Sequence, residues 1–142
     1  MPVFSGVEWS LDADLTETLT LTSSYTYTES EQKSGEYKGS PLTQLPEHQA
    51  TAGIDWKASA RLNPWLRITY RGEESQPTTG PSTNSLIAPS YTYVDTGLSY
   101  KWTESISTRA AVYNLMDEEV TEEEYGYVDD GRRYWLSVNV DF

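Results

Sequence analysis

The chain has 142 residues, a formal net charge of −12 from 10 basic and 22 acidic side chains, and no cysteine. This length suggests one domain. The acidic excess argues against nucleic acid as a partner, because binding phosphates needs a basic surface. The lack of cysteine excludes disulfides, a thiolate nucleophile and Cys-ligated metal sites. The longest apolar run, Ala110–Tyr113, is far shorter than the roughly 18 residues of a membrane-spanning helix, whereas the alternating spans of a β-barrel remain possible.

The aromatic composition is unusual, with 11 Tyr and 5 Trp against 2 Phe. Tyr and Trp combine an apolar ring with a polar group, so they suit surfaces that are partly wet. The first residues, Met1–Ser5, contain neither a basic segment nor an apolar stretch. We therefore expect no signal peptide in this chain.

The first predicted strand, Val7–Ala13, has Val, Trp, Leu and Ala on one face and Glu, Ser and Asp on the other. A short connection, Asp14–Thr18, leads to a second alternating stretch at Leu19–Tyr27. The long connection that follows, Thr28–His48, is rich in the Gly, Pro and Ser of loops. The same alternation predicts the third strand at Ala50–Trp56.

The fourth predicted strand, Leu66–Tyr70, follows a short connection at Ala58–Pro64. Another long, polar connection, Gly72–Ser90, separates it from the fifth strand, Val94–Trp102. In both strands every second residue is apolar or Thr, which is the period of a strand with one apolar face. Neither stretch has the 3.6-residue period of a helix, and no other part of the chain shows it convincingly.

The sixth predicted strand, Ile106–Val112, alternates more weakly and follows the short connection Thr103–Ser105. The last long connection, Met116–Arg133, leads to the seventh strand, Tyr134–Phe142. Short and long connections therefore alternate along the chain. This is the pattern of an up-and-down transmembrane β-barrel, whose periplasmic turns are short and whose outer loops are long.

Aromatic residues near both ends of the predicted strands support a barrel, because Tyr and Trp gather at membrane–water interfaces. Those near the short turns are Trp56, Trp102 and Phe142, and those near the long loops are Tyr25, Tyr27, Tyr70 and Tyr93. The polar faces carry charges at mid-strand, as a wet interior would, at Glu8, Asp12, Asp55, Lys101 and Arg109. The fold class predicted is all-β, an antiparallel up-and-down transmembrane β-barrel segment of about seven strands.

The alternative fold is a soluble β-sandwich with Tyr and Trp in its core. That alternative requires Trp9, Ile54, Leu98 and Val138 to meet one another inside a compact two-layer body. The predicted strand lengths also count against it, because soluble strands average about five or six residues.

The carboxyl terminus has an apolar or aromatic residue at every second position and ends on phenylalanine. This resembles the terminal sorting signal of outer-membrane barrels, which the barrel-assembly machinery reads by strand addition. The residues of the expected assembly signal are Tyr134, Leu136, Val138, Val140 and Phe142.

Longer motifs resemble the TonB-dependent outer-membrane receptors, in the branch that includes ferric-siderophore and colicin receptors. They are Gly6-Val7-Glu8, Leu45-Pro46-Glu47-His48, the turn from Tyr113 to Glu119, and the segment from Tyr125 to Trp135. In the turn, Met116 replaces the usual Phe and Glu118 the usual Lys. The resemblance runs from Gly6 to Phe142.

The resemblance implies that residues 1–142 are the carboxyl-terminal part of a receptor barrel of about 22 strands, without the plug domain and the amino-terminal strands. It implies a site in the outer membrane of a Gram-negative bacterium and TonB-dependent uptake of a ferric siderophore. The expected partners are the ferric siderophore, outer-membrane lipid and lipopolysaccharide, the barrel-assembly machinery, and TonB only through the missing plug. No cofactor is expected, since the iron complex would be the substrate.

The resemblance also implies that Arg and aromatic side chains in the outer loops bind the ligand, for which we expect Tyr125, Tyr127, Arg132 and Arg133. Guanidinium suits both catecholate oxygens and aromatic rings. The alternative is that the two arginines neutralise the acidic loop 117–130, which holds eight acids and no base. That loop could attract cations, but it lacks the spacing of a calcium loop, and no metal site is expected.

Two other classes of function remain as alternatives. One is a complete small β-barrel, either an outer-membrane protein or a lipocalin-like binding protein. The other is an enzyme of the outer-membrane phospholipase type, for which His48, the only histidine, would be needed. The sequence contains no Gly-x-Ser-x-Gly motif, and we do not expect an enzyme.

Overall fold

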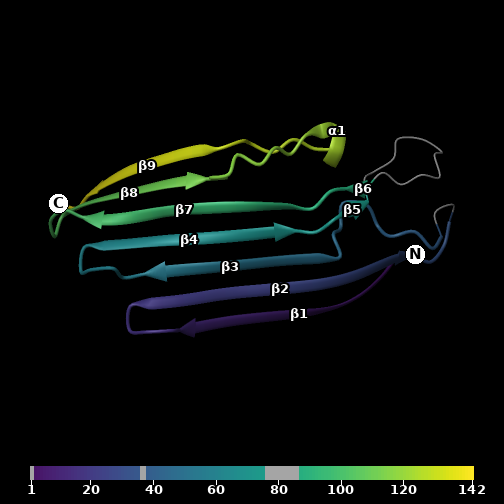
Figure 1. Cartoon of the computed structure of the whole chain (residues 1–142), viewed down its shortest axis with the longest axis horizontal. Coiled ribbons are helices and arrows are strands. Elements are labelled where there is room, and N and C mark those ends of the chain that lie inside the picture. Colours follow the sequence, from purple (N-terminus) through teal and green to yellow (C-terminus); the bar gives the residue numbers. More distant parts are fainter. Residues whose placement is uncertain (1, 36–37, 76–86) are drawn as a thin grey trace.

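The computed structural model describes residues 2–35, 38–75 and 87–142, and seven strands in this part form one antiparallel sheet (Figure 1). Each strand pairs with its neighbours along the chain, so the topology is a plain up-and-down meander and the predicted fold class is confirmed. The strands are β1 Pro2–Asp14, β2 Leu19–Gln32, β3 His48–Trp56, β4 Leu62–Arg71, β7 Tyr91–Lys101, β8 Ile106–Tyr113 and β9 Arg133–Val140.

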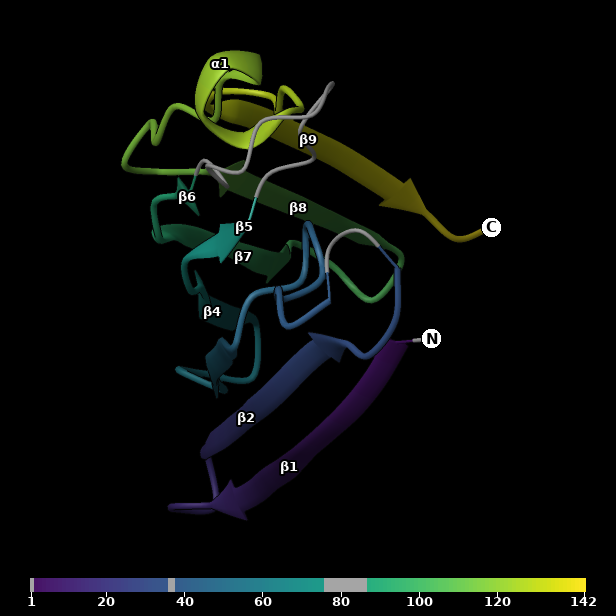
Figure 2. The ribbon, with the colours of Figure 1, turned by 90° about the vertical axis from the view of Figure 1, so that its right-hand side faces the viewer.

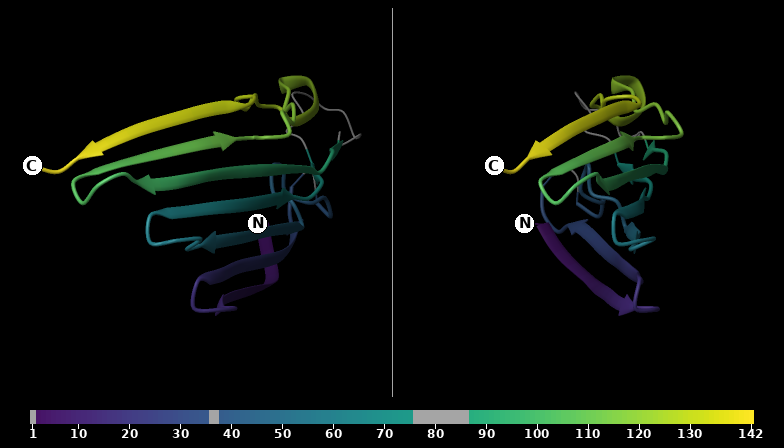
Figure 3. Two further views of the ribbon diagram at one scale, coloured as in Figure 1. Left: turned by 60° about the vertical axis from the view of Figure 1, so that its left-hand side comes forward. Right: turned by 90° about the vertical axis from the view of Figure 1, so that its left-hand side faces the viewer.

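The long connections lie at one end of the sheet and the short turns at the other, which we call the loop end and the turn end (Figure 1). The sheet curves into an open trough, with β1 and β9 as its two edges (Figure 2, Figure 3). Within the described residues these edges do not pair with each other. The complete small barrel, which would need such closure, therefore has no support from this structure.

Strand register keeps apolar and polar residues in separate rows across the sheet. One apolar row crosses three strands through Tyr25, Ala50 and Tyr70, which pair in register. The adjacent polar rows include the pairs Gly53–Arg67 and Arg67–Asp95. Since side chains alternate between faces, the sheet has one apolar face and one polar face, and loops fold over the concave side at the loop end (Figure 2).

The large apolar side chains lie on an uncovered face. The residues that a β-sandwich would bury together are all substantially exposed: Trp9 by 50%, Ile54 by 37%, Leu98 by 39% and Val138 by 62%. A face of this kind is stable only against hydrocarbon or another apolar surface, and the sandwich alternative is wrong. Among the described helices, none is long and apolar enough to cross a membrane.

Several predicted boundaries differ from the structure. β1 begins at Pro2 and β4 at Leu62, earlier than the alternation indicated, and β9 ends at Val140. Strand pairing continues past the apolar alternation because backbone hydrogen bonds do not depend on which side chain is present. Residues 36–37 and 76–86 of the predicted long connections lie outside the described residues.

Three short elements in the described parts of the long connections were not predicted. β5 (Glu74–Ser75) pairs with β6 (Ile87–Ala88), and α1 (Glu122–Tyr125) is one helical turn in the acidic loop. The side chain of Thr121 accepts a hydrogen bond from the N–H of Glu124, and Gly126 ends the turn with φ 73°. This is an N-cap followed by a glycine at a left-handed C-cap, too short for a helical period to appear in the sequence.

Candidate functional site at the loop end

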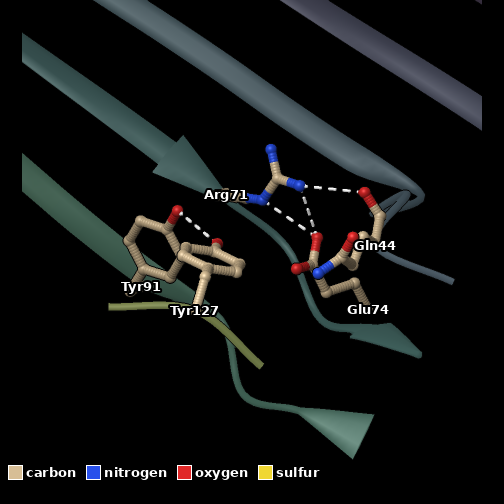
Figure 4. A network of polar contacts seen from close by, with 5 residues as sticks. All are labelled: Gln44, Arg71, Glu74, Tyr91 and Tyr127. Carbon is tan, nitrogen blue, oxygen red and sulfur yellow. Dashed lines mark hydrogen bonds and ion pairs between the residues drawn. The ribbon is translucent and has the colours of Figure 1, made fainter. Parts of the chain in front are cut away.

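The polar face carries a charged contact where β4 ends. Arg71 donates from Nε and Nη2 to Oε2 of Glu74, over 2.9 and 2.6 Å, and from Nη2 to the carbonyl oxygen of Gln44, over 3.0 Å (Figure 4). The Glu74 side chain is only 2% exposed, against 27% for Arg71. This contact joins the loop between β2 and β3 to the segment that follows β4.

A small apolar cluster holds the acidic loop against the neighbouring loop. Ala88, Val120 and Tyr125 are buried in it, with Tyr91 and Tyr127 among the partly buried rings around them. Tyr125 meets the ring of Tyr91 edge-on, with centroids 5.3 Å apart. Burial raises the pKa of Tyr125, and the nearby carboxylates act in the same direction. The neutral phenol is therefore the form that this cluster stabilises.

Hydrogen bonds also fix the acidic loop to the start of β7. The hydroxyls of Tyr91 and Tyr127 lie 3.0 Å apart (Figure 4), and the hydroxyl of Tyr93 donates to Oδ2 of Asp129 over 3.0 Å. Tyr91 and Tyr93 belong to the polar face of β7, so the loop folds inward over that face.

The turn after β8 is organised by Asn114, which is 4% exposed and has a positive φ of 51°. Its N–H donates to Oδ1 of Asp95, and its side chain exchanges two hydrogen bonds with the backbone of Glu118. Asn tolerates the left-handed region and bonds to nearby backbone. The turn that resembled the receptor family is therefore a structural corner.

Three of the four predicted ligand residues lie in the acidic loop and its end, the fourth begins β9, and the four do not converge on one point. Tyr125 is buried, at 3% exposure, and Tyr127 bonds to Tyr91. Arg132 donates from Nε to the carbonyl of Leu115 and lies 3.9 Å from Oδ2 of Asp117. These contacts are those expected if the arginines neutralise the acidic loop. The ligand-binding role of the four residues stays a prediction.

Arg133, the fourth predicted ligand residue, contacts Tyr113 and Asp130 rather than the residues that hold Arg132. Its guanidinium lies over the ring of Tyr113 at 5.7 Å from the centroid, and Nη1 donates to Oδ2 of Asp130 over 3.2 Å. The side chain is 57% exposed. Arg133 begins β9 in the register position of the polar face, opposite Tyr113.

An aromatic region further along the polar face was missed by sequence reasoning. The ring of Trp65 covers Gly97 so closely that a Cβ there would lie 2.7 Å from the ring. Arg67 stands over the same ring at 6.0 Å, and Tyr113 lies 6.3 Å from it. A glycine in a strand often marks such a close approach, and this was the available signal.

His48 and the acidic loop complete the set of candidates. Nδ1 of His48 lies 2.8 Å from the hydroxyl of Tyr25, whose ring stacks with the imidazole, and the ring of Tyr27 lies tilted to it at 5.3 Å. Across residues 2–35, 38–75 and 87–142, no three His, Asp or Glu side chains gather as a metal site would require.

The expected assembly signal lies at an edge of the sheet. Tyr134, Leu136 and Val138 of β9 are 75%, 70% and 62% exposed and face the apolar side. β9 pairs only with β8, so its other edge presents unpaired backbone groups within the described part of the chain. Phe142 lies beyond the strand and is fully exposed.

A family model described as "TonB dependent receptor-like, beta-barrel" matches residues 3–115. The "Iron-regulated outer membrane virulence protein" of Vibrio cholerae is 53% identical over 137 residues, which is 96% of this chain. The "Ferrienterobactin receptor" of Escherichia coli K12 is 28% identical over 170 aligned residues and 99% of this chain. The chain spans about a fifth of the length of these relatives, 21% and 22% respectively.

Solved structures share the fold. The closed form of the ferric-catecholate import receptor Fiu from Escherichia coli matches with a TM-score of 0.82 at 22% identity, over 99% of this chain and 21% of that one. A mutant of the Pseudomonas aeruginosa ferric enterobactin receptor PfeA, in complex with enterobactin, matches with a TM-score of 0.82 at 20% identity, over 99% and 23%. The family match, the outer-membrane relatives and the meander with its apolar outer face agree: the chain belongs to the TonB-dependent receptor family and forms part of an outer-membrane β-barrel.

Proposed function

We propose that the receptor containing this chain takes up a ferric siderophore across the outer membrane. The observation that carries the proposal is the separation of faces: a continuous apolar surface on one side and, on the other, a polar wall over which tied outer loops fold. That arrangement suits a water-filled passage with a ligand-receiving entrance. The names of two relatives, one iron-regulated and one a ferrienterobactin receptor, support iron as the cargo.

In this proposal the chain supplies wall, loops and assembly signal. The unpaired edges of β1 and β9 need further strands, because a bilayer does not tolerate an open sheet edge. We propose that these strands, and a plug through which TonB acts, come from the remainder of a longer receptor. Lipopolysaccharide and the barrel-assembly machinery are proposed partners of the apolar face and of β9. The relatives are named as receptors, and we propose no catalytic activity.

Within the proposed entrance, Arg132 and Arg133 are exposed cations that would meet an anionic iron complex. Tyr127 and Tyr125 would hold their loop in place, through the bond to Tyr91 and the buried cluster. Guanidinium groups suit catecholate oxygens because the fork of donors matches paired oxygen acceptors.

The test is a graft receptor, in which this chain replaces the matching 137-residue segment of the Vibrio cholerae relative. Cells that lack other iron receptors would be given ⁵⁵Fe-loaded enterobactin, a hydroxamate siderophore complex or a carboxylate siderophore complex. Copper and vitamin B12 serve as cargoes of other classes. TonB-dependent uptake of at least one of the three siderophore complexes supports the proposal.

A matched pair of variants tests the entrance. Arg133→Ala should lower siderophore uptake several-fold, since Arg133 is exposed on the polar face near the loop end. Arg61→Ala, an exposed arginine at the turn end, should leave uptake unchanged. A graft receptor that assembles in the outer membrane yet takes up copper or vitamin B12 and no siderophore complex would refute the proposed cargo.

A further inference from the structure

Among the described residues, the loop between β2 and β3 and the segment after β4 touch at a short contact. The N–H of Gln44 donates to the carbonyl of Ser75 over 2.7 Å, and Thr43 forms a parallel β-bridge with Ser75. Gln44 has a positive φ of 58°, which is uncommon for a residue other than glycine and persists only where surrounding contacts hold it. Contacts around Gln44 must therefore hold it in this conformation.

Arg71 supplies that restraint. One guanidinium nitrogen, Nη2, donates both to the carbonyl of Gln44 and to the carboxylate of Glu74, so a single group holds one residue from each side (Figure 4). β4 fixes the position of Arg71 through its pairing with Gln49 and Tyr91. The anchor is thus part of the rigid wall, and the residues it holds belong to the loops.

Glu74 makes this restraint sensitive to the loss of Arg71. Its side chain is 2% exposed, both hydrogen bonds from Arg71 go to Oε2, and Oε1 has no hydrogen-bond partner among the described residues. A buried carboxylate that loses its cation is strongly destabilised where it lies. Without Arg71, Glu74 would have to move toward water and take β5 with it.

The held contact borders a hollow of about 390 Å³ at the loop end. Pro41 and Leu45 line it from the β2–β3 loop, and Glu74 and Ser75 line it from the segment after β4. The strand residues that complete its lining, His48 and Tyr70, lie on the apolar face of the sheet. The shape of the hollow therefore depends on how the two loops are held together.

We propose that Arg71 is a positioning residue that clamps the β2–β3 loop onto β5 and so sets the shape of the entrance at the loop end. The inference deepens the proposed function and rests on it, because Arg71 stands on the polar face, which would line the passage that receives the ligand. Arg71 acts through Gln44 and Glu74 and does not contact the ligand itself. The clamp exists in the receptor whether or not ligand is present.

The first experiment measures amide hydrogen exchange in the graft receptor without ligand. In Arg71→Met, exchange should become at least about tenfold faster in both residues 41–47 and residues 72–75, because charge-assisted hydrogen bonds that limit local opening are lost. Arg71→Lys, which keeps the charge but lacks the fork, should give a smaller increase. Arg67→Met, on the same strand and face but 59% exposed, is the matched control and should change neither segment.

A disulfide separates positioning from direct contact. Thr43→Cys and Ser75→Cys replace two residues joined by an isolated β-bridge, whose backbones lie about as close as neighbouring strands do and so within reach of a disulfide. The chain has no other cysteine. In Arg71→Met with both cysteines, oxidation should return exchange and the uptake of ⁵⁵Fe-loaded enterobactin to within about twofold of the parent receptor, and reduction should abolish the rescue.

Unchanged exchange in Arg71→Met and Arg71→Lys, or faster exchange in only one of the two segments, would overturn the clamp. Restored exchange with uptake still lost would mean that Arg71 contacts the ligand, which also contradicts the inference. If the parent graft receptor takes up no siderophore complex, the proposed function fails. The exchange measurements still decide the clamp in that case.

Discussion

A charge placed on each face of β4 tests the central feature of the fold. Leu66 lies on the apolar face, in register with Ile54 and Thr96. It is four residues from both Leu62 and Tyr70, so at about 3.3 Å per residue it lies roughly 13 Å from each along the strand. That is the middle of the apolar band. Thr69, three residues further on, is exposed on the polar face.

The expected costs of the two substitutions differ strongly. An arginine facing lipid near the bilayer midplane destabilises a barrel by about 2–4 kcal/mol, so Leu66→Arg should reduce the folding equilibrium constant roughly 30-fold to several-hundred-fold. Thr69→Arg stays in water beside two other arginines of its face and should cost less than about 1 kcal/mol. The difference arises only if the apolar face meets hydrocarbon.

The free energy of unfolding would be measured by guanidinium titration of the graft receptor refolded in phospholipid vesicles, with mobility shift as the probe of the folded barrel. Equal costs for the two variants, or a larger cost for Thr69→Arg, would contradict the assignment of faces. Because both changes introduce the same side chain on one interior strand, differences in strand propensity largely cancel.

Three further outcomes follow from particular contacts. Gly97→Ala should cost about 1–3 kcal/mol in the same titration, because its Cβ would lie 2.6 Å from a backbone oxygen, whereas Gly131→Ala, with its nearest atom at 3.3 Å, should change little. Burial raises the pKa of Tyr125, so its contribution to the stability of the acidic loop should be fully present below about pH 10 and be lost as the pH rises through the folded-state pKa. Hydrogen exchange of the loop should therefore show less loosening at alkaline pH in Tyr125→Phe than in the parent. Phe142→Ala should lower outer-membrane accumulation several-fold on immunoblots, and Asp141→Ala should not.

The strands of this protein are predictable from sequence because each depends on a pattern of residues close together in the chain. Each residue of a strand faces one of two environments, and a period of two appears directly in stretches such as Leu19–Tyr27 and Val94–Trp102. Register then follows, since a shift by one residue would turn every apolar side chain toward water. The structure places Ala50 opposite both Tyr25 and Tyr70, as the shared apolar face requires.

The loop end is less predictable because its contacts join residues far apart in sequence. Arg71 and Gln44 are 27 positions apart, and Tyr91 and Tyr127 are 36 apart. Neither pair lies in a periodic pattern. The two-residue strands β5 and β6 and the single turn α1 are shorter than any window in which periodicity can be recognised.

In the candidate site, too, local features were predictable and contacts between distant residues were not. Composition and motif identified the loop that holds Tyr125, Tyr127, Arg132 and Arg133, and all four do lie at the loop end or beside it. Sequence could not show that Tyr125 would be buried, because its partners Ala88 and Val120 belong partly to another loop.

The strands of the wall and the contacts at the loop end should respond differently to mutation. Wall positions act through burial against lipid, a term that is roughly additive over separate sites. Positions at the loop end share partners: Arg71, Glu74 and Gln44 form one network, and loss of any member changes what the others contribute. Substitutions in the wall should therefore combine additively, whereas Arg71→Met and Glu74→Gln together should cost less than the sum of the two single changes, because the second removes the buried charge that the first leaves unpaired.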